Sequence, residues 1–117
     1  MFGMNRGGEI MTTFDKREEA FENKFALDEE QKFKAEARRN KLLGLWAAEQ
    51  LGLSSEAAKD YAKTVVAAEF SEGGRAAVIG KVMGDLSLKG VEITEAEIRA
   101  KIDVLTVEAI AQVKAGL

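Results

Sequence analysis

The sequence predicts an all-α protein built around a single hydrophobic core. Strong helix formers, chiefly Ala, Glu, Lys and Leu, dominate the 117-residue chain, and it contains no proline that would break a helix. Apolar residues recur at helical spacing in four successive segments separated by short, glycine-containing turns. Short turns favour antiparallel neighbours, so the expected architecture is a four-helix bundle, preceded by a mobile or short helical N-terminal segment.

The first helix of the bundle is expected to begin after Asp28 and to end at Leu51. Asp28 and Gln31 have the spacing of a capping box, and Gly52 suits the position just after the helix. Glu49 marks the solvent edge of the helix. The buried stripe is drawn through four apolar residues and widened by three more: Ala35, Leu42, Leu45 and Trp46, then Leu43, Ala47 and Leu51.

Three further helices follow. Ser54 or Ser55 is expected to cap the second, and Gly73-Gly74 to end it; Thr94 and Glu97 form a second capping box at the start of the fourth. The expected inward residues of the second helix are Ala58, Tyr61, Ala62, Val65, Val66 and Phe70. Those of the third are Val78, Ile79, Val82, Met83 and Leu86. Those of the fourth are Ile98, Ile102, Leu105, Ala109 and Val113.

Composition argues against several classes of function. The formal charge of −3 is too mild to imply a nucleic-acid partner. The chain has no cysteine and no histidine, which removes disulfides, thiolate sites, the commonest general base and the commonest metal ligand. We therefore expect no enzyme activity, no catalytic residue and no metal site.

The chain is expected to be cytoplasmic and not to insert into a membrane. The longest apolar run, residues 42–48, is far shorter than the ~20 residues that a membrane-spanning helix needs. The first ten residues lack the apolar centre of a signal peptide.

A glycine-rich stretch in the third helix resembles a phosphate loop but does not fit one. Five residues separate Gly74 from Gly80, where the pattern needs four, and Val82 occupies the place of the magnesium-binding Ser or Thr. The spacing of Gly80 and Gly84 is instead interpreted as close helix packing.

A basic stripe on the first helix has two interpretations. Its members are Lys32, Lys34, Arg38, Arg39 and Lys41. The stripe either complements acidic residues elsewhere in the chain or forms a docking site for phosphates or an acidic partner, because arginine side chains suit phosphate. Trp46, the only tryptophan, is interpreted as a core residue.

The N-terminal part of the chain divides into two segments ahead of the bundle at 28–117. Residues 1–10 are expected to be a disordered leader upstream of the true start at Met11, because residues 6–9 are what a translated ribosome-binding site would encode. In residues 11–27, Phe14, Phe21 and Phe25 share one helical face. Such a face belongs either to the core or to a detachable element that binds a groove on a partner.

Three stretches of the chain resemble the zeta subunit of the alpha-proteobacterial F-type ATP synthase. The first is Met11-Thr-x-Phe14-Asp15-x-Arg17-x-x-Ala20-Phe21-Glu22-x-Lys24-Phe25-Ala26-x-Asp28. The second is Phe33-Lys34-Ala35-Glu36-Ala37-Arg38-Arg39-Asn40 through Leu42-Leu43-Gly44-Leu45-Trp46-Ala47-Ala48. The third and weaker is Tyr61-Ala62-x-x-Val65-Val66 followed by Phe70.

The resemblance implies an inhibitor of ATP hydrolysis whose N-terminal segment inserts into the catalytic head of the synthase. The contact residues that it implies are Phe14, Asp15, Arg17, Phe21 and Phe25. No cofactor is implied, but a weak site for ADP or ATP is expected near Arg38 and Arg39. An ADP/ATP-sensing helical module without direct inhibition is the alternative, and the free protein is expected to be monomeric.

Overall fold

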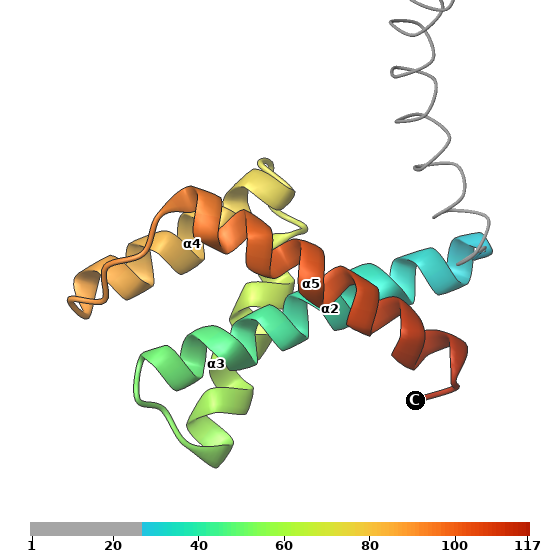
Figure 1. Ribbon diagram of the computed structural model, residues 1–117, viewed down its shortest axis with the longest axis horizontal. Coiled ribbons are helices and arrows are strands. Elements are labelled where there is room, and N and C mark those ends of the chain that lie inside the picture. The colour runs from blue at the N-terminus through green and yellow to red at the C-terminus, as the bar shows by residue number, and fades with distance from the viewer. Residues whose placement is uncertain (1–26) are drawn as a thin grey trace, which may run out of the picture.

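The computed structural model describes residues 27–117, which form four helices (Figure 1). These are α2 (Glu29–Gln50), α3 (Ser55–Ala68), α4 (Arg75–Leu88) and α5 (Glu95–Lys114). No strand occurs among residues 27–117. The all-α prediction is therefore confirmed. Residues 1–10, the predicted leader, lie outside the described residues. So do residues 11–26 of the predicted N-terminal segment, which was expected to span 11–27.

Helix α2 is the centre of the fold. It contacts each of the other three helices and packs most extensively against α3 and α5. Figure 1 shows α5 crossing α2, with α4 extending to one end of the molecule. All four helices contribute to one hydrophobic core: Leu43, Ala47, Val65, Val78, Ile79, Val82, Leu86, Ile98, Ile102 and Leu105.

The ends of α2 form as the sequence predicts. The Asp28 carboxylate accepts a hydrogen bond from the Gln31 backbone N–H at 2.7 Å, and the Asp28 N–H donates to the Gln31 side chain at 3.2 Å. At the other end Gly52 has φ +78°, and the Leu53 N–H donates to the Ala48 carbonyl at 2.9 Å. This bond closes a Schellman motif, which satisfies a backbone carbonyl at the helix end.

The buried stripe of α2 is shifted from the expected one: Ala35, Leu43 and Ala47 are buried as predicted, but other predicted positions are not. Leu42, Leu45 and Trp46 are only half-buried, whereas the fully buried positions after the first turns are Leu43, Gly44, Ala47 and Ala48. Glycine is needed at position 44 because α3 approaches α2 closely there, whereas the neighbouring Leu43 still fits into the core. The exposed position of Glu49 is as predicted.

The end of α3 was predicted wrongly. The helix stops at Ala68, before Gly73-Gly74, and Phe70 lies beyond it with 68% of its surface exposed. Ser54 is the N-cap residue of α3, but its side chain makes no capping hydrogen bond. In α5, Val113 is only half-buried, and Ile110 joins the buried face instead.

The close helix approach lies at Gly44 and not at the Gly80–Gly84 pair. A Cβ built on Gly44 would meet the Cα of Ala62 at 2.6 Å, closer than real Cβ atoms come to other heavy atoms. A Cβ at Gly80 or Gly84 would have no atom within 4 Å. Gly44 therefore allows α2 and α3 to cross in contact, and the interpretation of Gly80 and Gly84 as packing residues is wrong.

Candidate functional site

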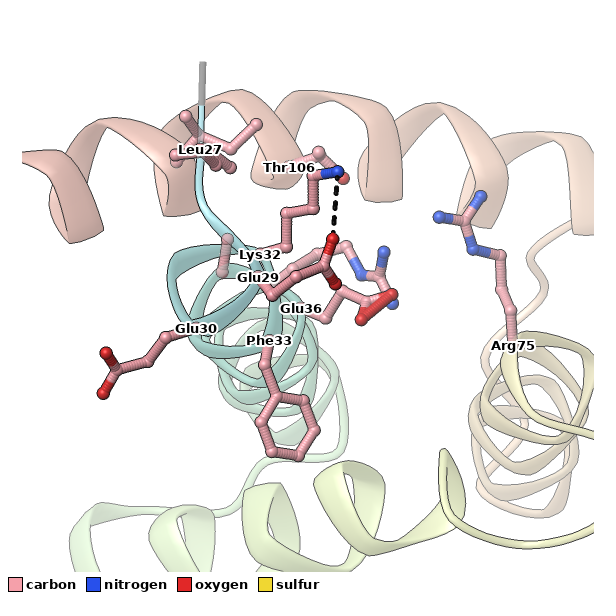
Figure 2. Close-up of a pocket in the computed structure, with 11 residues that line it drawn as sticks. Leu27, Glu29, Glu30, Lys32, Phe33, Glu36, Arg75 and Thr106 are labelled. Carbon is pink, nitrogen blue, oxygen red and sulfur yellow. Dashed lines mark ion pairs between the residues drawn. The ribbon is translucent and has the colours of Figure 1, made fainter. Parts of the chain in front are cut away.

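An open groove of about 680 Å³ lies between the first half of α2, the start of α4 and α5. Leu27, the first described residue, is among the residues that line it (Figure 2). Most of the groove wall is apolar or carries the aliphatic stems of charged side chains. The residues that line it are Leu27, Glu29, Glu30, Lys32, Phe33, Ala35, Glu36, Arg39, Arg75, Thr106 and Ile110.

The charges around this groove are incompletely paired. Lys32 forms an exposed ion pair with Glu29, with 3.7 Å between Nζ and the carboxylate oxygen. Arg75 extends from α4 on the other side of the groove from α2 (Figure 2), and it makes no ion pair or hydrogen bond with any described residue. The groove therefore offers a guanidinium without an ion-pair partner among the described residues, although three carboxylates, Glu29, Glu30 and Glu36, also line it.

Arg39 is a structural residue in this part of the chain. Only 3% of its surface is exposed, and its guanidinium donates to a Glu69 carboxylate oxygen at 3.0 Å. Asn40, also buried, donates to the same oxygen at 2.6 Å and accepts from Arg39 at 3.2 Å. Burial lowers the pKa of Arg39, and the positive charge of Arg75 lowers it further, against the opposite effect of Glu69. The cluster joins α2 to the end of α3.

Arg38 points to a different helix. Its guanidinium donates to the side-chain oxygen of Gln112 at 2.8 Å and to the backbone oxygen of Leu117 at 2.6 Å. Arg38 lines a second groove, of about 400 Å³, together with Lys34, Ala37, Lys41, Val66, Val113, Gly116 and Leu117. The two arginines that the sequence analysis placed at one site therefore line separate grooves.

An exposed aromatic pair lies beside the first groove. Phe33 on α2 and Phe70 after α3 meet edge to face, with ring centroids 6.3 Å apart, and 60% and 68% of their surfaces are exposed. The sequence does not predict this pair: it places Phe70 among the inward residues of the second helix and gives Phe33 no role. On a helical wheel Phe33, seven residues before Asn40 and eleven before Gly44, falls on the buried face of α2, so periodicity alone gives no signal that it is exposed.

A polar cluster joins α3 to α4 on another face. The Tyr61 hydroxyl donates to the Asp85 carboxylate at 2.7 Å, and the Lys81 ammonium reaches the same oxygen at 3.1 Å. The Lys81 ammonium also lies 5.2 Å from the centre of the Tyr61 ring. Partial burial, and then the hydrogen bond to Asp85, raise the pKa of Tyr61 above its ordinary value of 10.0.

Trp46 lies between the core and the surface. It is half-buried, packs against the core, and has the Lys101 ammonium 5.6 Å from its ring centre. Its assignment to the core therefore holds for one face of the ring, while the other face binds a cation of α5.

The described residues line two grooves with apolar and charged side chains. No group of three or more carboxylates within residues 27–117 could hold a metal ion. None of the helices in this range has the length and apolar content needed to cross a membrane. The predicted contact residues Phe14, Asp15, Arg17, Phe21 and Phe25 lie outside the described residues.

The fold and grooves define a small all-helical domain with surfaces suited to binding. The profile of the family described as ATPase inhibitor subunit zeta matches residues 11–112, which is most of the chain. The chain belongs to this family. This confirms the resemblance found in the sequence, and the matched range includes the predicted N-terminal segment but not residues 1–10.

A solved structure supports the fold. It is described as a solution NMR structure of a protein, shares 53% sequence identity with this chain and superposes with a TM-score of 0.64. The alignment covers 73% of this chain and 96% of the other. No curated protein matches the chain.

Proposed function

We propose that the protein is an inhibitory regulatory subunit of the F-type ATP synthase and blocks ATP hydrolysis by inserting residues 11–27 into the catalytic head. The observation that carries the proposal is the family match, which begins at Met11 and runs through this segment. The bound protein would lie at the cytoplasmic face of the membrane that holds the synthase. When free it would be a monomer.

The phenylalanine face of residues 11–27 precedes the four helices in the chain. Within residues 28–117 the four helices bury their apolar stripes against one another in one core. Phe14, Phe21 and Phe25 are therefore free to bury their rings against a partner, and an amphipathic segment with three such anchors suits a hydrophobic groove. Asp15 and Arg17 would add polar contacts at the rim of that groove.

The test is ATP hydrolysis by a purified catalytic head with added protein. The variant Phe14→Ser, Phe21→Ser and Phe25→Ser should inhibit at least ~10-fold more weakly, because each buried ring contributes ~1.5–3 kcal/mol and tenfold in affinity is ~1.4 kcal/mol. The matched control changes two exposed apolar residues of α5, Val104→Ser and Val107→Ser. Absence of inhibition by the unaltered chain would refute the inhibitory function, and equal inhibition by both variants would move the active surface to the bundle.

A second candidate function is the sensing of ADP or ATP. Three cations, Lys34, Arg38 and Lys41, line the second groove, and no Asp or Glu side chain lines it. Lys34 pairs with Glu30 at 3.6 Å, and Arg38 is bonded to Leu117. Such a surface favours phosphate groups. Arg39 fits this role less well than Arg38, because its guanidinium is buried against Glu69.

Nucleotide titration followed by NMR would test this candidate. Binding should shift the backbone amide signals around Arg38 and Val113, and the Lys41→Gln variant should bind more weakly. The matched control is Lys59→Gln on α3, an exposed lysine outside the groove. The same weak shifts in both variants would indicate non-specific binding and contradict the candidate.

A further inference from the structure

The first groove lies where residues 11–26 join the bundle. Leu27 lines the groove, so Ala26 and the residues before it are attached at its rim. A tether this short raises the local concentration of the segment to the order of millimolar, so even weak contacts with the groove would be populated. Proximity alone does not select an occupant, but the composition of the groove does.

The apolar lining of the groove matches the aromatic face of this segment. Phe33, Ala35 and Ile110 give the groove an apolar wall, and the exposed Phe33–Phe70 pair extends it. An exposed aromatic pair of this kind is typical of a binding surface. Phe21 and Phe25 are the residues of the segment nearest in sequence to the rim.

The charges also match. Glu18 is four residues after Phe14 and three before Phe21, so at helical spacing it lies on the same face as the phenylalanines. On the groove side, Glu29 and Glu30 pair with Lys32 and Lys34, whereas Arg75 has no ion-pair partner within residues 27–117, and its charge lowers the pKa of Arg39. A carboxylate on the apolar face of the occupant would therefore pair with Arg75 and relieve the repulsion between the two arginines.

We propose that in the free protein residues 11–26 dock into the groove between α2, α4 and α5, with Phe21 and Phe25 on the apolar wall and Glu18 at Arg75. This inference rests on the proposed function and adds a regulatory step to it. The segment that enters the catalytic head would first have to leave the groove, and the free energy of leaving would reduce the apparent affinity for the head.

Paramagnetic relaxation in the full chain tests the proposal directly. The chain has no cysteine, so a single nitroxide can be attached at Asp103→Cys, an exposed site one turn before Thr106 on α5. The amide signals of Phe21 and Phe25 should lose most of their intensity. The control label is Glu92→Cys, in the turn at the far end of α4 from Arg75, and it should leave these signals much stronger. Equal intensities with the two labels would overturn the proposal.

Two further measurements identify the occupant and the charge contact. Mixing isotope-labelled unmodified protein with nitroxide-labelled protein should broaden nothing; broadening there would mean that a second copy, and not the same chain, fills the groove. Arg75→Glu should release the segment and restore the Phe21 signal, and adding Glu18→Arg should broaden it again. If Arg75→Glu restored the Phe21 signal and the added Glu18→Arg change did not broaden it again, the Glu18–Arg75 contact would be wrong.

The proposal and the proposed function fail in different experiments. If the protein inhibits ATP hydrolysis but the Asp103 label leaves Phe21 and Phe25 unaffected, the groove does not hold the segment and the inhibitory function stands. If the label broadens these signals and the protein does not inhibit, docking stands as a property of the chain and the inhibitory function is wrong.

Discussion

Single residues decide where this fold places its buried charge. Arg39 and Asn40 are enclosed between α2 and the end of α3, and one carboxylate oxygen of Glu69 satisfies both. No buried side-chain nitrogen or oxygen within residues 27–117 lacks a hydrogen-bond partner. Removing one member of a buried ion pair lowers the free energy of unfolding by ~3–5 kcal/mol, because the other charge is left buried without a partner. Arg39 therefore stabilises the fold. This is why the basic stripe divides into a buried part and a surface part.

Tyr61 provides a prediction about pH. It is protonated in both states below pH 10, and its hydrogen bond to Asp85 then contributes fully to stability. Above pH 10.0, its ordinary pKa, the unfolded chain ionises Tyr61 first, because the folded pKa is raised. The free energy of unfolding should therefore fall as the pH rises above 10, by up to ~1.4 kcal/mol per pH unit from this group.

The measurement is simple because the chain contains one tyrosine. Tyrosinate absorbance should appear well above pH 10 in the folded protein and near pH 10 in denaturant. Asp85→Asn should lower the folded value towards the ordinary one without reaching it, because burial is the larger cause of the shift. A folded tyrosine that titrates at its ordinary pKa would contradict the Tyr61–Asp85 contact.

At the scale of elements, residues close together in the sequence determine where the helices begin and end, whereas residues far apart determine how the helices contact one another. Capping boxes open α2 and α5, and Schellman motifs close α2, α4 and α5 with glycines at positive φ. Side-chain and backbone hydrogen bonds between residues within six positions of one another create these features. The crossing of α2 and α3 depends instead on Gly44 and Ala62, which are distant in sequence.

The three mid-helix glycines should therefore respond in opposite directions to substitution by alanine. Gly44→Ala should destabilise the protein by ~1–3 kcal/mol, because its Cβ would overlap the backbone of Ala62. Gly80→Ala and Gly84→Ala should each stabilise it by up to ~1 kcal/mol, because the added methyl meets open space and alanine favours the helix. Urea unfolding of the three variants measures both effects. A Gly44→Ala protein as stable as the unaltered chain would show that the helices do not cross in contact there.

At the scale of the whole molecule, α2 connects all the parts. It contacts α3, α4 and α5, and the core draws residues from each of the four helices. Loss of α2 would expose the core on every side. The described residues should therefore unfold as one cooperative unit.

The single tryptophan allows this cooperativity to be measured. Trp46 lies on α2 beneath Lys101 of α5, so its fluorescence reports on the contact between these helices. The urea transition followed by Trp46 fluorescence should coincide with the transition followed by helical circular dichroism. If the fluorescence changed at lower urea concentration than the helical signal, α5 would leave α2 before the helices melt.

The sequence by itself determined which segments are helices, where most of them begin and end, and the family. Helical periodicity and capping pairs depend on neighbours in the chain, so they can be read without a structure. The basic stripe and the phenylalanine face were also found in this way, and Phe14, Phe21 and Phe25 remain a sequence-based prediction.

Only the tertiary structure decided which basic residues are free and which face of each helix is buried most deeply. Arg38 and Arg39 are adjacent in sequence, yet one bonds to α5 and the other to Glu69 beyond α3. Small residues of α2 occupy its most deeply buried positions because α3 is in contact with α2 at Gly44. These outcomes depend on pairs of residues far apart in the chain, and the periodicity of a single helix carries no information about its partner.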